Sequence, residues 1–362
     1  MYEKKLEARK SEFDFVKSIL IILVVWGHVC SYISDYHYDR NQITSVVRLF
    51  QMPMFIMISG YFSKESKSFA DVKHLVIKTV NRLLYPYLIW SVIGVAIVIS
   101  RDILTGSSMK IRGGGIVYFL KLLASESNIL WYLGCLFLCT ICYAFFSWLS
   151  NSYREVFIWL SGFSVLLIPY DLWHFSFLYP FFLLGSYMRK INLRKFINTK
   201  CLLSTMLIAV LLLIGSWFIP TSYTFYNSTN FLLTSGWDKL CLQLGFVFIR
   251  YVIYVATTIC YFLLFLNIYE VVKDFKITKS FCNLGTKTMG VFLVHILLLY
   301  HIFRPIALAI TDEKGFIPDF PFVRYYILGT AISYVTIVLS VYIIMNLEKH
   351  MVTKKLFLGK YT

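Results

Sequence analysis

The stretch FVKSILIILVVWGHVCSYIS, residues 15–34, has the length and composition of a helix that crosses a lipid bilayer. About 20 residues at about 1.5 Å per residue span the ~30 Å hydrocarbon core. Further apolar blocks follow along the chain, in which 58% of the 362 residues are hydrophobic and only 15% are charged. Because soluble domains carry about 25% charged residues, this composition excludes an ordinary soluble enzyme. The sequence predicts an all-α integral membrane protein.

Ten apolar blocks are separated by charged or turn-rich segments, and we interpret each as one transmembrane helix. The expected spans cover residues 15–34, 45–63, 84–100, 129–149, 154–169, 172–188, 202–219, 240–267, 288–310 and 323–346. The loops between them are too short to fold alone. We therefore expect a single membrane-embedded domain over residues 1–362.

The lysines and arginines are distributed unevenly between the two sides of this topology. Successive segments between the ten spans lie on alternate sides of the membrane. The side that holds the N-terminal tail carries 23 of the 35 basic residues, and the opposite side carries seven. Cytoplasmic loops are enriched in lysine and arginine, so both termini are expected in the cytoplasm and the chain in the cell membrane. Topology thus accounts for most of the net charge of +16. Anionic membrane lipid, and not nucleic acid, is the expected partner of the basic loops.

The first span contains ionisable groups at membrane depth, where such groups are costly and usually serve a function. Asp14 and Lys17 are three residues apart, so they can pair on one face of a helix. Lys17 and His28 are eleven residues apart, about three helical turns, so they share a face about 16 Å apart along the axis. The pattern fits a structural histidine that bonds to a neighbouring helix as well as a functional one.

Small polar and basic residues mark the cytoplasmic ends of the next two spans. Ser59, Gly60 and Tyr61 form a small polar patch, which fits either close helix packing or a functional site. Arg82, with Lys78 four residues before it, precedes the third span. These cations either anchor the helix to lipid headgroups or bind the phosphates of a ligand.

Three further candidates lie in later spans. Trp131, with Tyr132 next to it, fits an interfacial aromatic belt or a platform for a sugar. Arg250 in the eighth span needs an acidic partner, a phosphate or a water-filled cavity, and His295 is near the middle of the ninth span. Cys139 and Cys142 form a C-x-x-C within a span, which favours packing over metal binding. The motifs of zinc peptidases, P-loop proteins and serine hydrolases are absent from the sequence, so we expect no metal.

In their order along the chain these features resemble the acyltransferase 3 family of integral-membrane enzymes. The features are the Lys17–His28 spacing, MPMFIMISGYF at 52–62, RLLYPYLIW at 82–90, ILWYLGCLF at 129–137 and GVFLVH at 290–295. The sequence is most similar to the branch of fucose 4-O-acetylase-like proteins, over nearly its whole length. The resemblance implies a membrane O-acyltransferase that moves an acetyl group from cytoplasmic acetyl-CoA to a hydroxyl of a cell-surface or lipid-linked carbohydrate.

The resemblance also implies roles for individual residues. His28 matches the catalytic histidine of the family, and Arg82 matches a basic cluster that contacts acyl-CoA. Lys17 stands at a position that is usually arginine, which removes the bidentate contact that an arginine makes. Gln51 stands where the family often has a histidine, so no second imidazole is expected there.

The expected chemistry combines these assignments. Basic groups at the cytoplasmic mouth suit the phosphates of acetyl-CoA; they are Lys17, Lys78 and Arg82. His28 acts as general base on the acceptor hydroxyl or carries the acetyl group itself. Ser59 and Gly60 match a Ser-Gly motif of the family, and Ser59 and Tyr61 are candidate hydrogen-bond donors to the thioester oxyanion.

Two other classes of protein stay open on the residues alone. A transporter or flippase for a lipid-linked sugar would line its path with groups such as Arg250 and His295, but the inverted repeats common in transporters are not visible in this sequence. A polysaccharide polymerase would carry its catalytic residues on long outer loops, whereas the largest outer loop here has about 28 residues.

Overall fold

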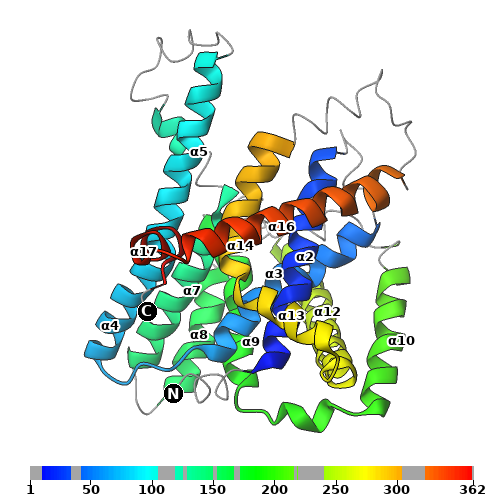
Figure 1. Cartoon of the computed structure of the whole chain (residues 1–362). Helices are drawn as coiled ribbons and strands as arrows, with labels where there is room; N and C mark the ends of the chain where they lie inside the picture. Colours follow the sequence, from blue (N-terminus) through cyan, green and yellow to red (C-terminus); the bar gives the residue numbers. More distant parts are fainter. Residues whose placement is uncertain are drawn as a thin grey trace. The chain divides into compact units, whose positions relative to one another are not determined.

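The computed structural model describes residues 10–33, 42–104, 119–124, 129–149, 153–166, 172–215, 218, 240–303 and 323–360. Every regular element within these ranges is a helix (Figure 1), which confirms the predicted all-α class. In chain order the elements are α2 (Ser11–Ile33), α3 (Gln42–Phe62), α4 (Phe69–Thr79), η2 (Val80–Leu84), α5 (Tyr85–Leu104), α7 (Trp131–Leu149), α8 (Arg154–Leu166), η3 (Leu172–His174), α9 (Phe175–Met188), η4 (Leu193–Phe196), α10 (Thr199–Gly215), α12 (Leu240–Val272), α13 (Lys276–Thr286), α14 (Thr288–Leu297), η8 (Leu298–Phe303), η9 (Val323–Leu328), α16 (Gly329–Leu347) and α17 (Met351–Leu358).

Six helices among the described residues are long and apolar enough to cross a membrane, or seven if Lys276–Thr286 and Thr288–Phe303 together form one broken span. Three predicted spans coincide with shorter helices: α8, α9 and α10 have 13, 14 and 17 residues. A full crossing takes about 20 residues. Parts of the predicted spans lie outside the described ranges, within residues 167–171, 216–217, 219–239 and 304–322. The count of ten and the cytoplasmic termini stay predictions.

The helix that contains the third predicted span begins well before residue 84. The helix starts at Phe69 and runs through the π-helical segment η2 into α5, with Phe69–Arg101 forming one candidate span. A capping box sets this start, because the Ser68 hydroxyl accepts from the Asp71 amide at 3.2 Å and the Asp71 carboxylate accepts from the Ser68 amide at 2.9 Å. The basic residues expected just before the span, Lys78 and Arg82, therefore lie on a helix.

The described residues fall into two compact units. The first unit is drawn from residues 1–27, 35–64 and 152–288, and the second from residues 28–34, 65–151 and 289–362. Helix α2 contributes its first part to the first unit and its last part, from His28, to the second.

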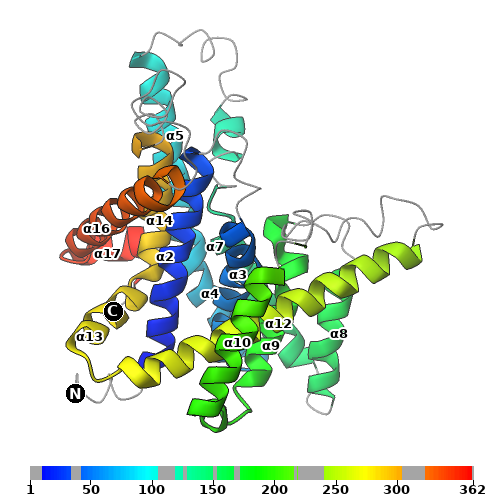
Figure 2. The ribbon, with the colours of Figure 1, turned by 90° about the vertical axis from the view of Figure 1, so that its right-hand side faces the viewer.

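In the first unit α3 and α9 lie side by side (Figures 1 and 2). Two glycines allow this close approach, since a Cβ on Gly60 would lie 2.0 Å from the carbonyl oxygen of Phe182 and one on Gly185 would lie 1.8 Å from that of Met57. Figure 2 also shows α10 lying against α12. This unit therefore packs by direct backbone contact between helices, as small residues permit within membranes.

In the second unit α4 and η2 contact α7, while α17 contacts α5. The indole Nε1 of Trp90 on α5 donates to the carbonyl oxygen of Phe357 on α17 at 2.8 Å, and the two rings meet edge to face. Gly290 on α14 packs closely against α16, since a Cβ at this position would lie 2.9 Å from the side chain of Ile344. The Trp90–Phe357 contact fixes the last helix of the chain to the helix that carries Lys78 and Arg82.

Candidate active site

Two histidines from distant parts of the sequence are in contact in the second unit. His28 on α2 and His295 on α14 have ring centroids 5.5 Å apart, with an angle of 45° between the ring planes. His295 is completely buried, and His28 is partly exposed. The sequence placed each histidine in a span but did not predict that they meet.

The position of the proton on His295 follows from a backbone contact. Its Nδ1 lies 2.8 Å from the carbonyl oxygen of Val291, one turn earlier in α14. Because a carbonyl oxygen only accepts hydrogen bonds, Nδ1 carries the proton in the neutral ring and Nε2 keeps its lone pair. Nε2 is buried and has no hydrogen-bond partner among the described residues. It is therefore an acceptor that a hydroxyl or an imidazole N–H can use.

Aromatic rings extend from the histidine pair toward α7. The ring of Phe292 lies 5.5 Å from that of His295, and the ring of Tyr132 lies 5.2 Å from that of Phe292. Trp131 meets Tyr132 edge to face, with centroids 6.3 Å apart. The sequence pointed to the pair Trp131 and Tyr132 and to Trp131 as the site candidate, whereas Tyr132 is the residue that contacts the ring beside His295. The motif ILWYLGCLF contained both, but only helix packing shows which side chain lies against α14.

The predicted pairing of Asp14 with Lys17 is confirmed in the first unit. The Lys17 amine lies 2.6 Å from the Asp14 carboxylate, which is buried. Helix α13 packs on this turn of α2: the Ser18 hydroxyl donates to the Phe281 carbonyl at 2.6 Å, and a Cβ on Gly285 would lie 1.9 Å from the Asp14 carbonyl oxygen. A buried carboxylate therefore balances the charge of Lys17, and its expected contact with acyl-CoA stays a prediction.

The Ser59-Gly60-Tyr61 patch makes structural contacts in the first unit. The Ser59 hydroxyl donates to the Phe55 carbonyl at 2.9 Å, one turn earlier in α3. The Lys10 amine donates to the Tyr61 hydroxyl at 2.5 Å, and Gly60 forms part of the contact between α3 and α9. These contacts agree with the packing interpretation of the patch. The proposed role of Ser59 and Tyr61 as oxyanion donors stays a prediction.

Arg250 is completely buried in the first unit. Its guanidinium carbon lies 5.1 Å from the centre of the Phe177 ring, within the range of a cation–π contact. The same carbon lies 6.0 Å from the centre of the Tyr254 ring, and Arg48 on α3 is a second buried arginine of this unit. The sequence singled out Arg250 but not Arg48, although both are charged residues in predicted spans.

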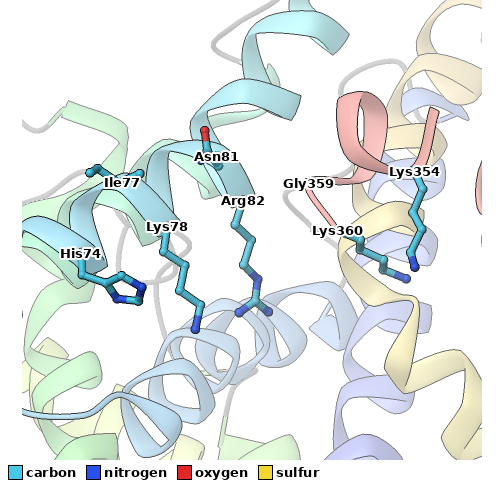
Figure 3. A pocket seen from close by; sticks show the side chains of 8 residues that line it. All are labelled: His74, Ile77, Lys78, Asn81, Arg82, Lys354, Gly359 and Lys360. Carbon is cyan, nitrogen blue, oxygen red and sulfur yellow. The ribbon is translucent and has the colours of Figure 1, made fainter. Parts of the chain in front are cut away.

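Lys78 and Arg82 line one pocket of the second unit, with a volume of about 560 Å³ (Figure 3). This agrees with their predicted association in one basic site. Within the described ranges, no three His, Cys, Asp or Glu side chains lie close enough together to hold a metal ion.

Comparison with known sequences places the chain in a family. Residues 10–345 match the type 3 acyltransferase family, whose conserved region is described as an acyltransferase domain. This chain belongs to that acyltransferase family. The predicted resemblance is confirmed at the level of the family, while the fucose 4-O-acetylase-like branch stays a prediction.

This acyltransferase family member also resembles two curated proteins. Nodulation protein NolL of Sinorhizobium fredii is 30% identical over 183 residues, which make up 49% of this chain and 48% of that protein. Nodulation protein NolL of Mesorhizobium japonicum is 34% identical over 85 residues, 23% of each chain. The matches thus span about half the length or less of these relatives. No solved structure matches the chain.

Proposed function

We propose that this protein is a membrane O-acyltransferase that moves an acetyl group from acetyl-CoA to a hydroxyl of a cell-surface or lipid-linked carbohydrate. Membership of the acyltransferase family supports the reaction class. The contact between His28 and His295 is the structural observation that carries the proposal. The distribution of basic residues supports a location in the cell membrane with both termini in the cytoplasm.

His28 is the general base in this scheme. Its imidazole takes the proton of the acceptor hydroxyl, the alkoxide oxygen attacks the thioester carbonyl carbon, and the carbon–sulfur bond of acetyl-CoA breaks. The proton then passes from His28 to the departing thiolate. The products are an acetyl ester and free CoA, and His28 returns to its neutral form.

His295 is the positioning residue in this scheme. During the reaction, in this proposal, one ring nitrogen of His28 donates a hydrogen bond to Nε2 of His295, which has no hydrogen-bond partner among the described residues. The other nitrogen of His28 then acts as the base. The backbone bond from Nδ1 of His295 to Val291 fixes the tautomer that this arrangement needs. In catalytic triads a third group orients the general base in the same way.

The test is acetyl transfer from labelled acetyl-CoA in membranes that contain the natural acceptor glycan. We expect His28→Ala to lower the rate by about 10²–10⁴-fold, the range that a general base contributes. His301→Ala is the matched control, because it removes another histidine of the helical segment that follows α14. This control should keep wild-type transfer.

The outcomes separate the parts of the proposal. If His28→Ala accumulates normally and transfers at the wild-type rate, His28 is not the base. If His28 becomes acetylated when the acceptor is absent, it carries the acetyl group and the base mechanism is wrong. If the wild-type protein neither binds acetyl-CoA nor changes the acetyl content of the glycan, the acyltransferase function is refuted and a transporter or flippase for a lipid-linked sugar becomes the better hypothesis.

A further inference from the structure

The basic pocket of the second unit has two walls that are far apart in sequence. One wall belongs to the helix that runs through α4 and η2, and the other belongs to the C-terminal segment around α17. The lining residues are His74, Ile77, Lys78, Asn81 and Arg82 from the first wall and Lys354, Gly359 and Lys360 from the second. Figure 3 shows Lys78 and Arg82 on the first wall and Lys354 and Lys360 on the second.

The backbone of the C-terminal wall is held in place at its last turn. Helix α17 ends at Gly359, which has φ +60° and caps the carbonyl groups of Lys354 and Lys355. A Cβ on Gly359 would lie 2.4 Å from the carbonyl oxygen of Arg82, so only glycine allows the turn to approach η2 this closely. The Trp90–Phe357 hydrogen bond anchors the preceding turn of α17. Lys354 and Lys360 are therefore presented by a fixed backbone.

The charges of the pocket are only partly neutralised by protein groups. Lys360 forms a salt bridge with Glu348, and His74 is close to Asp71. Lys78, Arg82 and Lys354 have no ion pair with any described acidic residue. Cations brought together in this way repel one another, and a bound anion with several charges relieves the repulsion.

The shape and lining of the pocket favour the phosphates of a nucleotide. Its volume of about 560 Å³ lies within the range of about 300–1,000 Å³ of small-molecule sites. Five of the eight lining residues, His74, Lys78, Arg82, Lys354 and Lys360, have basic side chains, and Ile77 is the one residue with a hydrocarbon side chain. Phosphate groups are shared by nucleotides and anionic lipids, but a cluster of several cations suits a ligand with several phosphate charges.

We propose that Lys354 and Lys360 of the C-terminal segment, together with Lys78 and Arg82, bind the phosphates of the 3′-phosphorylated nucleotide end of acyl-CoA. The inference rests on the proposed function, and it makes α17 and the residues after it part of the donor site. Each lysine then contributes a charge-assisted hydrogen bond to a phosphate oxygen. Lys354 contributes more than Lys360, because Glu348 competes for the Lys360 amine.

The test is the KM for acetyl-CoA and the equilibrium binding of CoA, measured on the purified full-length protein in phosphatidylcholine nanodiscs. We expect Lys354→Gln to raise KM by about tenfold and the Lys354→Gln/Lys360→Gln pair by more, with kcat unchanged, since each lost contact is charge-assisted. Dephospho-CoA, which lacks the 3′-phosphate, should bind more weakly than CoA to the wild type and show a smaller difference in the double variant. Lys349→Gln is the matched control, because it removes an exposed C-terminal lysine that bonds to Asn346 outside the pocket.

Three results would overturn the inference, and they are distinguishable from one another. If the wild type transfers acetyl while both lysine variants keep its KM, the C-terminal wall does not bind the donor although the proposed function holds. If the variants change only the response to added phosphatidylglycerol and leave KM and CoA binding unchanged, the pocket binds anionic lipid. If the wild type itself neither transfers acetyl nor binds CoA, the proposed function fails and this inference fails with it.

Discussion

Replacing His295 by phenylalanine separates the chemical role of this side chain from its contribution to stability. His295 is completely buried, its Nδ1 contact is local to α14, and its Nε2 has no hydrogen-bond partner among the described residues. Phenylalanine is apolar and similar in volume, and volume-conserving substitutions are well tolerated in tightly packed sites.

The expected change in the free energy of unfolding follows from two opposing effects. Losing the bond from Nδ1 to the Val291 carbonyl costs about 1 kcal/mol, because that carbonyl also accepts the helical amide. Removing a buried acceptor without a partner recovers about 1–3 kcal/mol. The variant should therefore be as stable as the wild type or up to about 2 kcal/mol more stable. Activity should be lost, because the ring no longer positions His28.

The assay combines thermal unfolding in detergent with acetyl transfer in membranes. We expect His295→Phe to unfold at or above the wild-type midpoint and to transfer at least about 10²-fold more slowly. His295→Gln should recover part of the rate, because its amide oxygen supplies an acceptor near the position of Nε2. A clearly lower unfolding midpoint, or wild-type transfer by His295→Phe, would refute the assignment of a positioning role.

Two further predictions concern the packing of each unit. Gly185→Ala should lower the free energy of unfolding by at least about 1–3 kcal/mol, because the new Cβ would overlap the backbone of Met57. Gly245 faces open space. Gly245→Ala is therefore the control, and it should be neutral or stabilising in the same thermal assay. Trp90→Phe should raise the KM for acetyl-CoA about fivefold without changing kcat, because it removes the bond that anchors α17. Trp159→Phe is the matched control, because Trp159 is exposed. An equal rise in KM for Trp159→Phe would contradict this reasoning.

The features that the sequence predicted correctly depend on neighbouring residues. Apolar blocks of about 20 residues predict helices because helix length and hydrocarbon thickness are matched locally. Asp14 and Lys17 pair because positions three apart lie on one helix face. The early start at Phe69 was also local information, since Ser68 and Asp71 form a capping box. Hydropathy alone does not include that signal, so it did not predict that the helix extends back to Phe69.

The candidate site depends on contacts that the sequence alone does not specify. His28 meets His295, and the turn at Gly359 meets Arg82, across hundreds of residues. Helices that are apolar on every side carry no polar stripe to show which face is buried, so the pattern identified the histidines without pairing them. From the sequence alone, Lys354 and Lys360 are basic residues of the C-terminal tail with no assigned function.

The sequence by itself thus determined the class of the protein, its helices and its family, because these follow from local composition, spacing and motif order. The tertiary structure decided which functional groups meet. Helix packing joins two histidines in one site, and the close approach of Gly359 to the backbone of Arg82 places the C-terminal lysines beside that arginine.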